Sequence, residues 1–299
     1  MKTKKFIAWG WKQNVNTFHY IMLSYLRAFK YFGYDVYHFD DSDDVSGFDF
    51  SNCVFFTEGQ VDSNIPISRD SIYILHNCVV ENYKDLNHLG LQVYINGATE
   101  GGHGGSQSGF FIDEYTIYNE DENVLYQPWA TNLFPDEIER DLIVQDNKIS
   151  SFVGTIGSGH FGNTPQIIPY AKSCERFGYN FISYPPGSCS FEENRNIIAS
   201  SEIAPTITGS WQTAQGYIPC RAFKNISYGK LCITNSKTVR DVMGGNVVYN
   251  ENPECLIEDY LSTDFSVRKK MFSESSKLII DKHTYLNRVD SILRVLECR

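Results

Sequence analysis

The residues with the clearest chemistry lie in one segment, GYIPCRAFKNISYGKLCITNS, at positions 216–236. Pro219 suits the first turn of a helix, where a missing N–H costs nothing, and Gly229 suits the position after a helix end, which requires a positive φ. Arg221 would then stand at the start of this helix, where backbone N–H donors also gather. Such a place could bind a diphosphate. The alternative is an ordinary helix–strand unit whose arginine is only solvated.

Strands and helices that would position this segment precede it along the chain. Residues 5–9 predict a buried strand, residues 17–32 a helix with apolar side chains at helical spacing, and residues 35–39 a second strand. This opening is typical of a doubly wound α/β sheet. Further apolar runs stand at 53–57, 71–75, 91–95 and 123–127.

A second α/β alternation begins near residue 149, after a linker that contains Pro128 and Pro135. Ser190 with Glu193 forms a capping-box pattern at the start of one of its helices. The predicted strands are 150–153, 179–183, 203–207, 231–234 and 247–249, the predicted helices are 164–177 and 190–201, and residues 264–296 are expected to be mostly helical. Because the alternation restarts, we expect two sheets.

A glycine-rich loop, GTIGSGHFGN at 154–163, follows the first strand of this second alternation. Its glycines do not stand where a dinucleotide fingerprint needs them, and no acidic residue convincingly ends the next strand. An enzyme that uses NAD or S-adenosylmethionine therefore stays an alternative only. The chain has no P-loop, no H-E-x-x-H and no G-x-S-x-G, so it lacks the signatures of nucleotide hydrolysis, zinc proteolysis and serine hydrolysis.

The segment at 219–235 resembles the donor-binding segment of GT-B glycosyltransferases, which reads R-x-F-E…G…L-x-T-[DN]. The matching residues are Arg221, Phe223, Gly229, Thr234 and Asn235. Lys224 stands where many relatives carry a Glu that holds the donor ribose, and this departure keeps a non-catalytic nucleotide-sugar-binding protein open as an alternative. The run PWATNLFP at 128–135 is similar to the segment that joins the two domains in some of these enzymes.

The resemblance implies two Rossmann-like α/β domains that face each other across a cleft. Residues 1–145 would form the acceptor domain, residues 146–278 the nucleotide-sugar donor domain, and residues 279–299 a C-terminal helix that could pack back on the first domain. The implied activity is transfer of a hexosyl or related sugar from a UDP- or GDP-linked donor to a glycan or other hydroxyl acceptor. No cofactor and no metal are expected, because GT-B enzymes usually act without a metal.

Donor-binding residues are expected in the glycine-rich loop and around the central segment. In GT-B enzymes the first loop of the second domain approaches the donor diphosphate, and Arg221 would stabilise the charge of the departing nucleotide. The expected donor-binding residues are Thr155, Gly157, Ser158, Gly159, Trp211, Gln212, Tyr217, Arg221, Lys224 and Asn225. Trp211, Gln212 and Tyr217 could contact the base or the sugar, and Trp211 could equally pack between domains.

Acceptor-binding residues are expected where the first-domain strands end, since ligands of open α/β sheets bind beyond the carboxyl ends of the strands. The candidates are Trp11, Lys12, Gln13, Asn14, Asn77, Asn96 and His103. His103 belongs to the glycine-rich stretch at 99–109, which is either a surface loop or a lid. Glu58 and His76 follow strands and, with His103, are the candidates for a catalytic base, so the expected catalytic residues are Glu58, His76 and Arg221.

The composition of the chain disfavours several classes of binding partner. The formal charge of −10 opposes broad binding to nucleic acid or to an anionic membrane, although one local basic pocket stays compatible with it. No apolar run approaches the length of a membrane span. The eight cysteines form no C-x-x-C pair, which disfavours zinc and favours a reducing, cytoplasmic setting.

Overall fold

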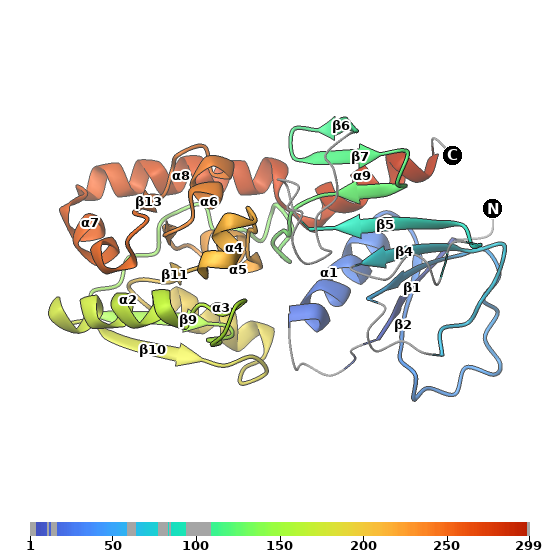
Figure 1. Cartoon of the computed structure of the whole chain (residues 1–299), viewed down its shortest axis with the longest axis horizontal. Coiled ribbons are helices and arrows are strands. Elements are labelled where there is room, and N and C mark those ends of the chain that lie inside the picture. The colour runs from blue at the N-terminus through green and yellow to red at the C-terminus, as the bar shows by residue number, and fades with distance from the viewer. Residues whose placement is uncertain are drawn as a thin grey trace. The chain divides into compact units, whose positions relative to one another are not determined.

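The computed structural model describes residues 4–10, 12, 17–58, 64–76, 83, 85–93 and 109–297 (Figure 1). The chain divides into two compact units. The first unit combines Met1–Pro128 with Tyr285–Arg299, and the second unit is Trp129–Thr284. The sequence places these boundaries elsewhere, near 145/146 and 278/279.

The first unit is built on an eight-stranded sheet in the order β2-β1-β3-β4-β5-β8-β7-β6. Neighbouring strands are parallel except in the pairs β8–β7 and β7–β6, which are antiparallel. The strands are β1 Lys5–Trp9, β2 Asp35–Phe39, β3 Cys53–Thr57, β4 Ile72–His76, β5 His88–Gln92, β6 Phe110–Asp113, β7 Thr116–Asn119 and β8 Val124–Tyr126. The predicted doubly wound opening is confirmed. The strands β1 and β2 pair in parallel, and the helix α1 (Thr17–Tyr31) connects them.

Two features of this sheet were not predicted. The hairpin of β6 and β7 lies in a stretch whose sequence shows no alternation, and β5 begins three residues before the expected run at 91–95. Gly90 explains the second difference: a Cβ atom at this position would lie 2.8 Å from Cγ2 of Val124 in the neighbouring strand. The glycine allows β8 to approach, and it also weakens the apolar pattern from which a strand is recognised.

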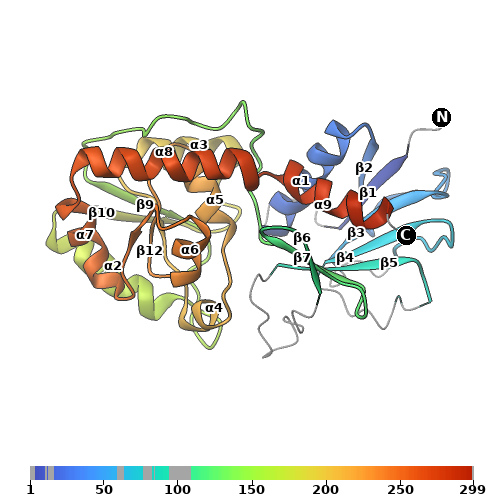
Figure 2. The same ribbon diagram turned by 90° about the horizontal axis from the view of Figure 1, so that it is seen from above.

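The last helix, α9 (Tyr285–Glu297), belongs to the first unit and lies beside α1 (Figures 1 and 2). The Tyr285 ring contacts Tyr20 and Tyr25 of α1 edge-on, with centroids 6.4 and 5.0 Å away. The Nε of the buried Arg288 donates to the Pro128 carbonyl over 2.8 Å. This helix therefore completes the core of a unit whose other elements come from the start of the chain.

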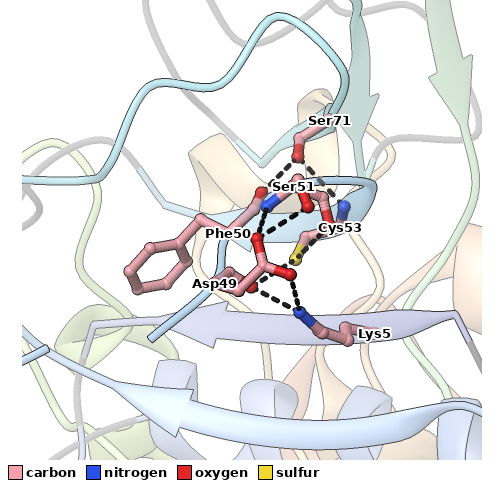
Figure 3. Close-up of polar contacts among 6 residues, drawn as sticks. All are labelled: Lys5, Asp49, Phe50, Ser51, Cys53 and Ser71. Carbon is pink, nitrogen blue, oxygen red and sulfur yellow. Dashed lines mark hydrogen bonds and ion pairs between the residues drawn. The ribbon is translucent and has the colours of Figure 1, made fainter. Parts of the chain in front are cut away.

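The amino ends of β1, β3 and β4 are tied by a polar cluster (Figure 3). Lys5 Nζ pairs with the Asp49 carboxylate at 3.1 Å, and the Asp49 side chain accepts from the amide and hydroxyl of Ser51. Ser71 Oγ donates to the Phe50 carbonyl and accepts from the Cys53 amide. The hydrogen bonds from Ser51, followed by Lys5, lower the pKa of Asp49. The cluster is structural and leaves the carboxyl ends of the strands for chemistry.

The second unit contains a five-stranded parallel layer. A two-stranded sheet, β10-β9, and a three-stranded sheet, β11-β12-β13, are joined by an isolated bridge between Ser150 and Ile203, which gives the order β10-β9-β11-β12-β13. The strands are β9 Ile149–Val153, β10 Asn180–Tyr184, β11 Pro205–Thr206, β12 Ile233–Thr234 and β13 Val248–Tyr249. The strand order reverses between β9 and β11, and ligands of such sheets bind at that switch point.

The helices of the second unit follow the predicted alternation. The capping box at the start of α3 is confirmed, with Ser190 Oγ accepting from the Glu193 amide and the Glu193 carboxylate accepting from the Ser190 amide. The long helix α8 packs along α5 (Figure 2). The helices are α2 Thr164–Arg176, α3 Phe191–Ser200, α4 Ser210–Ala214, α5 Cys220–Ser227, α6 Lys237–Val242, α7 Leu256–Ser262 and α8 Phe265–Lys282, with a 3₁₀ turn at Pro253–Cys255.

Candidate functional site

Arg221 is the second residue of α5, at the carboxyl ends of β9 and β11. The helix runs from its N-cap, Pro219, to Tyr228, and Gly229 follows with φ of +88°, as its position in the sequence predicts. The start of the helix thus offers backbone N–H groups and the positive end of its dipole next to a guanidinium.

The Arg221 guanidinium is held in place by the backbone and by an aromatic ring. Its Nη1 donates to the Ile207 carbonyl over 3.0 Å, and its Cζ lies 4.2 Å from the centroid of the Phe152 ring. A Cβ atom at Gly154 would lie only 2.7 Å from Nη2, so this glycine makes room for the arginine. Among the residues that the structure describes, no carboxylate forms an ion pair with Arg221. Burial lowers the pKa of the Arg221 guanidinium.

The glycine-rich loop after β9 folds back on itself beside this arginine. The Gly157 amide donates to Asn163 Oδ1, and the Gly157 carbonyl accepts from both the amide and the hydroxyl of Thr164. A Cβ atom at Gly162 would lie 2.1 Å from the Gly157 carbonyl oxygen, and one at Gly209 would lie 2.2 Å from that of Gly162. The loops after β9 and β11 therefore touch through glycines and form one surface.

The structure brings most predicted donor-binding residues to this surface. Thr155, Ser158 and Gly159 are exposed in the first loop, while Gly157 is half-buried there. Trp211 and Gln212 stand on α4, where the Gln212 side chain accepts from the Gly209 amide.

Three further predicted donor-binding residues have side chains that contact, or are buried in, the rest of the second unit. The Tyr217 hydroxyl accepts from Trp129 Nε1 over 3.1 Å. The Asn225 amide donates to the Ala204 carbonyl inside the unit, so this residue supports α5 from within. Lys224 is 7% exposed, and burial, with a smaller contribution from Arg221, lowers its pKa against the opposing effect of Cys220.

In the first unit, Glu58 directly follows β3 and His76 is the last residue of the adjacent strand β4. Thr57 pairs with Leu75 in the parallel register of these strands, so both residues stand at the same edge of the sheet. Both side chains are buried, and the His76 ring lies 5.8 Å from Phe18 and 5.9 Å from Phe56. Their burial is that of core residues at the carboxyl edge of the sheet.

Of the remaining acceptor candidates, only Lys12 lies among the residues that the structure describes. Lys12 Nζ pairs with Asp43 Oδ1 at 2.5 Å. Trp11, Gln13, Asn14, Asn77, Asn96 and His103 lie outside the described residues.

Several side chains at strand ends were missed by the sequence analysis. His38 Nε2 donates to the Gly10 carbonyl over 2.6 Å at the end of β2, and burial lowers the pKa of His38. His160 and Phe161 contact Trp211 in the second unit. The loop at 154–163 was recognised by its glycines, and its sequence does not show whether the rings of His160 and Phe161 are exposed.

The part of the chain that the structure describes holds no candidate metal site and no candidate membrane span. Within it, no three His, Cys, Asp or Glu side chains are placed to share a metal ion. No helix in this part of the chain combines the length and apolar character needed to cross a bilayer.

No protein-family model and no curated protein sequence matches the chain. Solved structures match it over nearly its whole length. An alpha-glucosyltransferase in complex with UDP and a 13-mer DNA containing a central A:G mismatch aligns with a TM-score of 0.63 and 8% identity, covering 99% of this chain and 100% of that one. A glycosyltransferase from Rickettsia africae ESF-5 aligns at 0.54 and 9% identity, covering 100% and 98%.

A further match is WaaG, a glycosyltransferase involved in lipopolysaccharide biosynthesis, with a TM-score of 0.52, 10% identity and coverage of 96% and 99%. These likenesses, at identities of 8–10%, concern the fold. The chain has the GT-B glycosyltransferase fold, with Rossmann-like parallel sheets, as the sequence resemblance implies.

Proposed function

We propose that the chain is a glycosyltransferase that takes a sugar from a nucleoside-diphosphate donor bound by the second unit. One observation carries the proposal: Arg221, at the switch point and at the start of α5, has a backbone carbonyl and a ring as its partners and no carboxylate ion pair among the described residues. The guanidinium is half-buried, and pairing with an anion would offset the cost of its partial desolvation. A diphosphate would supply that anion.

The same geometry supports a role for Arg221 in the reaction. As the glycosidic bond to the diphosphate breaks, negative charge grows on the departing phosphate. A guanidinium contacts phosphate oxygens with two parallel N–H donors, and the free N–H groups at the start of α5 add neutral donors. Fixed donors of this kind lower the barrier because they need no reorganisation during the step. This stabilisation requires no metal ion, so we propose metal-independent transfer.

The donor is proposed to be UDP- or GDP-linked. UDP is present in the matched alpha-glucosyltransferase complex, which favours testing UDP-sugars first. The acceptor is proposed to be a glycan or another hydroxyl compound bound by the first unit, with Glu58 or His76 as a base if the reaction inverts the sugar. DNA in that complex raises a nucleic-acid acceptor as an alternative, which the charge of −10 opposes.

A thermal-shift panel tests this proposal. UDP-glucose, GDP-mannose, NAD and S-adenosylmethionine are added separately to the full chain in EDTA. A donor at 100 times its Kd should add about 2.7 kcal/mol of stability, whereas the two cofactors should add none. Stabilisation by NAD or S-adenosylmethionine alone would contradict the proposal. Binding without any turnover would instead indicate a non-catalytic protein of the same fold.

A further inference from the structure

Three aromatic side chains gather near Arg221, two in the loop after β9 and one on α4, the helix that follows β11. The Phe161 ring packs edge-on against Trp211 with centroids 4.8 Å apart, and the His160 ring lies 4.8 Å from Phe161 and 6.3 Å from Trp211. Phe161 is 62% exposed although its ring is large and apolar. The nearby Ile156 is also exposed, at 37%. We call His160, Phe161 and Trp211 the aromatic platform.

The backbone beneath the platform is closely packed. Gly162 and Gly209 approach so tightly that neither position has room for a Cβ atom. Asn163 bonds Gly157 and Thr155 from below, through its Oδ1 and Nδ2. The Phe161 ring, held on this fixed frame, keeps most of its apolar surface in water, which is unfavourable unless a ligand covers it. Phe161, with the half-buried Trp211 beside it, is therefore placed to contact a ligand.

The platform and Arg221 rest on the same two loops. Gly154, beside the guanidinium, opens the loop whose tip carries His160 and Phe161. Ile207, which accepts from Arg221, lies four residues before Trp211. A ligand held at Arg221 through phosphate would thus have the platform within the same surface.

The chemistry of the rings selects a class of ligand. The faces of aromatic rings are electron-rich, and they attract the weakly positive C–H groups on the face of a pyranose ring. The formal charge of −10 disfavours a nucleic acid as the stacking partner. We propose that the aromatic platform stacks on a pyranose ring, either the transferred sugar of the donor or the acceptor sugar. This inference rests on the proposed function.

Calorimetric titration of the full chain tests the platform. The probes are UDP, UDP-glucose, GDP-mannose and maltose, and the variants are Phe161→Ala, Trp211→Ala and Trp211→Phe. We expect each alanine variant to keep the UDP affinity of the parent. Affinity for a nucleotide sugar should fall about three- to tenfold if the platform holds the donor sugar, and affinity for maltose should fall by that factor if it holds the acceptor. Trp211→Phe, which keeps a ring, should lose less.

The controls distinguish sugar binding by the aromatic platform from diphosphate binding at Arg221. Ile168→Ala removes another exposed apolar side chain, 49% exposed on α2, and should change no affinity. The platform is overturned if the alanine variants bind nucleotide sugars and maltose as the parent does, or if UDP itself weakens by the same factor as UDP-glucose. A parent that fails to bind UDP contradicts the proposed function instead, and the variants' response to maltose then decides the platform by itself.

Discussion

The two ends of the sheet in the second unit each hold a cation whose polar partner is a backbone carbonyl. Arg221, at the carboxyl end, donates to Ile207, and Lys230, at the amino end, donates to Ile143 over 2.8 Å. Neither forms an ion pair with a carboxylate among the described residues. Lys230 is 1% exposed under the linker that leads to β9, whereas Arg221 is half-buried beside glycines.

This difference teaches what distinguishes a binding site from a buried charge. At Lys230 the wall is closed by side chains: a Cβ atom at the preceding Gly229 would lie 2.6 Å from Cδ1 of Ile143. At Arg221 the side chain is half-buried and Gly154 stands next to the guanidinium, so that a ligand can reach the cation. The comparison predicts that changes at Arg221 affect ligand binding and that changes at Lys230 affect stability.

The largest effect is expected at Arg221. Arg221→Ala should fold normally but lose about 2–4 kcal/mol of binding free energy for UDP-sugars, because a preorganised charged donor to the phosphate is removed. Arg221→Lys should recover only part, since a point charge cannot reproduce the two-pronged contact. Calorimetric titration measures both. Unchanged affinity for UDP-sugars in Arg221→Ala would mean that Arg221, like Lys230, takes no part in ligand binding.

Lys230 should show the opposite behaviour. Burial lowers its pKa from 10.5 to about 8, so the unfolded chain binds more protons than the folded one between these values. Parental stability should therefore rise with pH by about 2–3 kcal/mol relative to Lys230→Met across pH 8–10.5, and this gain should be lost again as the pH falls from 10.5 to 8. Urea unfolding at pH 7, 8.5 and 10 measures this difference, and UDP affinity should be the same in both proteins. Parallel pH curves would refute the role of this lysine.

Gly154 offers a smaller, more local change at the carboxyl end. Its φ of +150° disfavours a side chain, and a Cβ would collide with the Arg221 guanidinium. Gly154→Ala should weaken UDP binding by about 1–2 kcal/mol through displacement of Arg221. Gly178→Ala is the matched control, since its φ is +75° but no atom lies within 4 Å of the added Cβ. This control should lose about 1 kcal/mol of stability and no affinity. Equal affinity in both variants would argue against a tight fit at Arg221.

Chelation should have the smallest effect of all. If Arg221 and the start of α5 supply the positive charge for the diphosphate, EDTA should leave both UDP-sugar affinity and turnover unchanged. Activity assays with EDTA, and with added Mg²⁺ or Mn²⁺, check this. Loss of turnover on chelation and its return with a metal would show that the arginine does not suffice.

Sequence patterns predicted the parts of the fold that depend on local chemistry. Gly229 ends α5, Ser190 and Glu193 cap α3, and Arg221 begins a helix at a strand end, because each depends on residues close in the chain. The features that were missed depend on distant contacts. The approach of Gly162 to Gly209, which displays Phe161 and Trp211, is one such feature, and the approach of β8 to β5 at Gly90 is another.

Glu58 and His76 show the same limit. Both were candidates because they stand at strand ends, but the pairing of β3 with β4 and the packing of His76 against Phe18 and Phe56 depend on residues distant in the chain. A sequence shows that a residue follows a strand. It does not show which strand lies next to it or whether solvent reaches it.

The most direct test of the account is the release of free nucleotide from UDP-glucose and GDP-mannose by the parent and by Arg221→Ala, each followed in EDTA. The account predicts measurable release of UDP or GDP by the parent, even with water as the only acceptor, and a rate lower by about 30- to 1,000-fold in the variant. No release from any nucleotide sugar, or release at the same rate by both proteins, would contradict the assignment of Arg221 to the departing diphosphate.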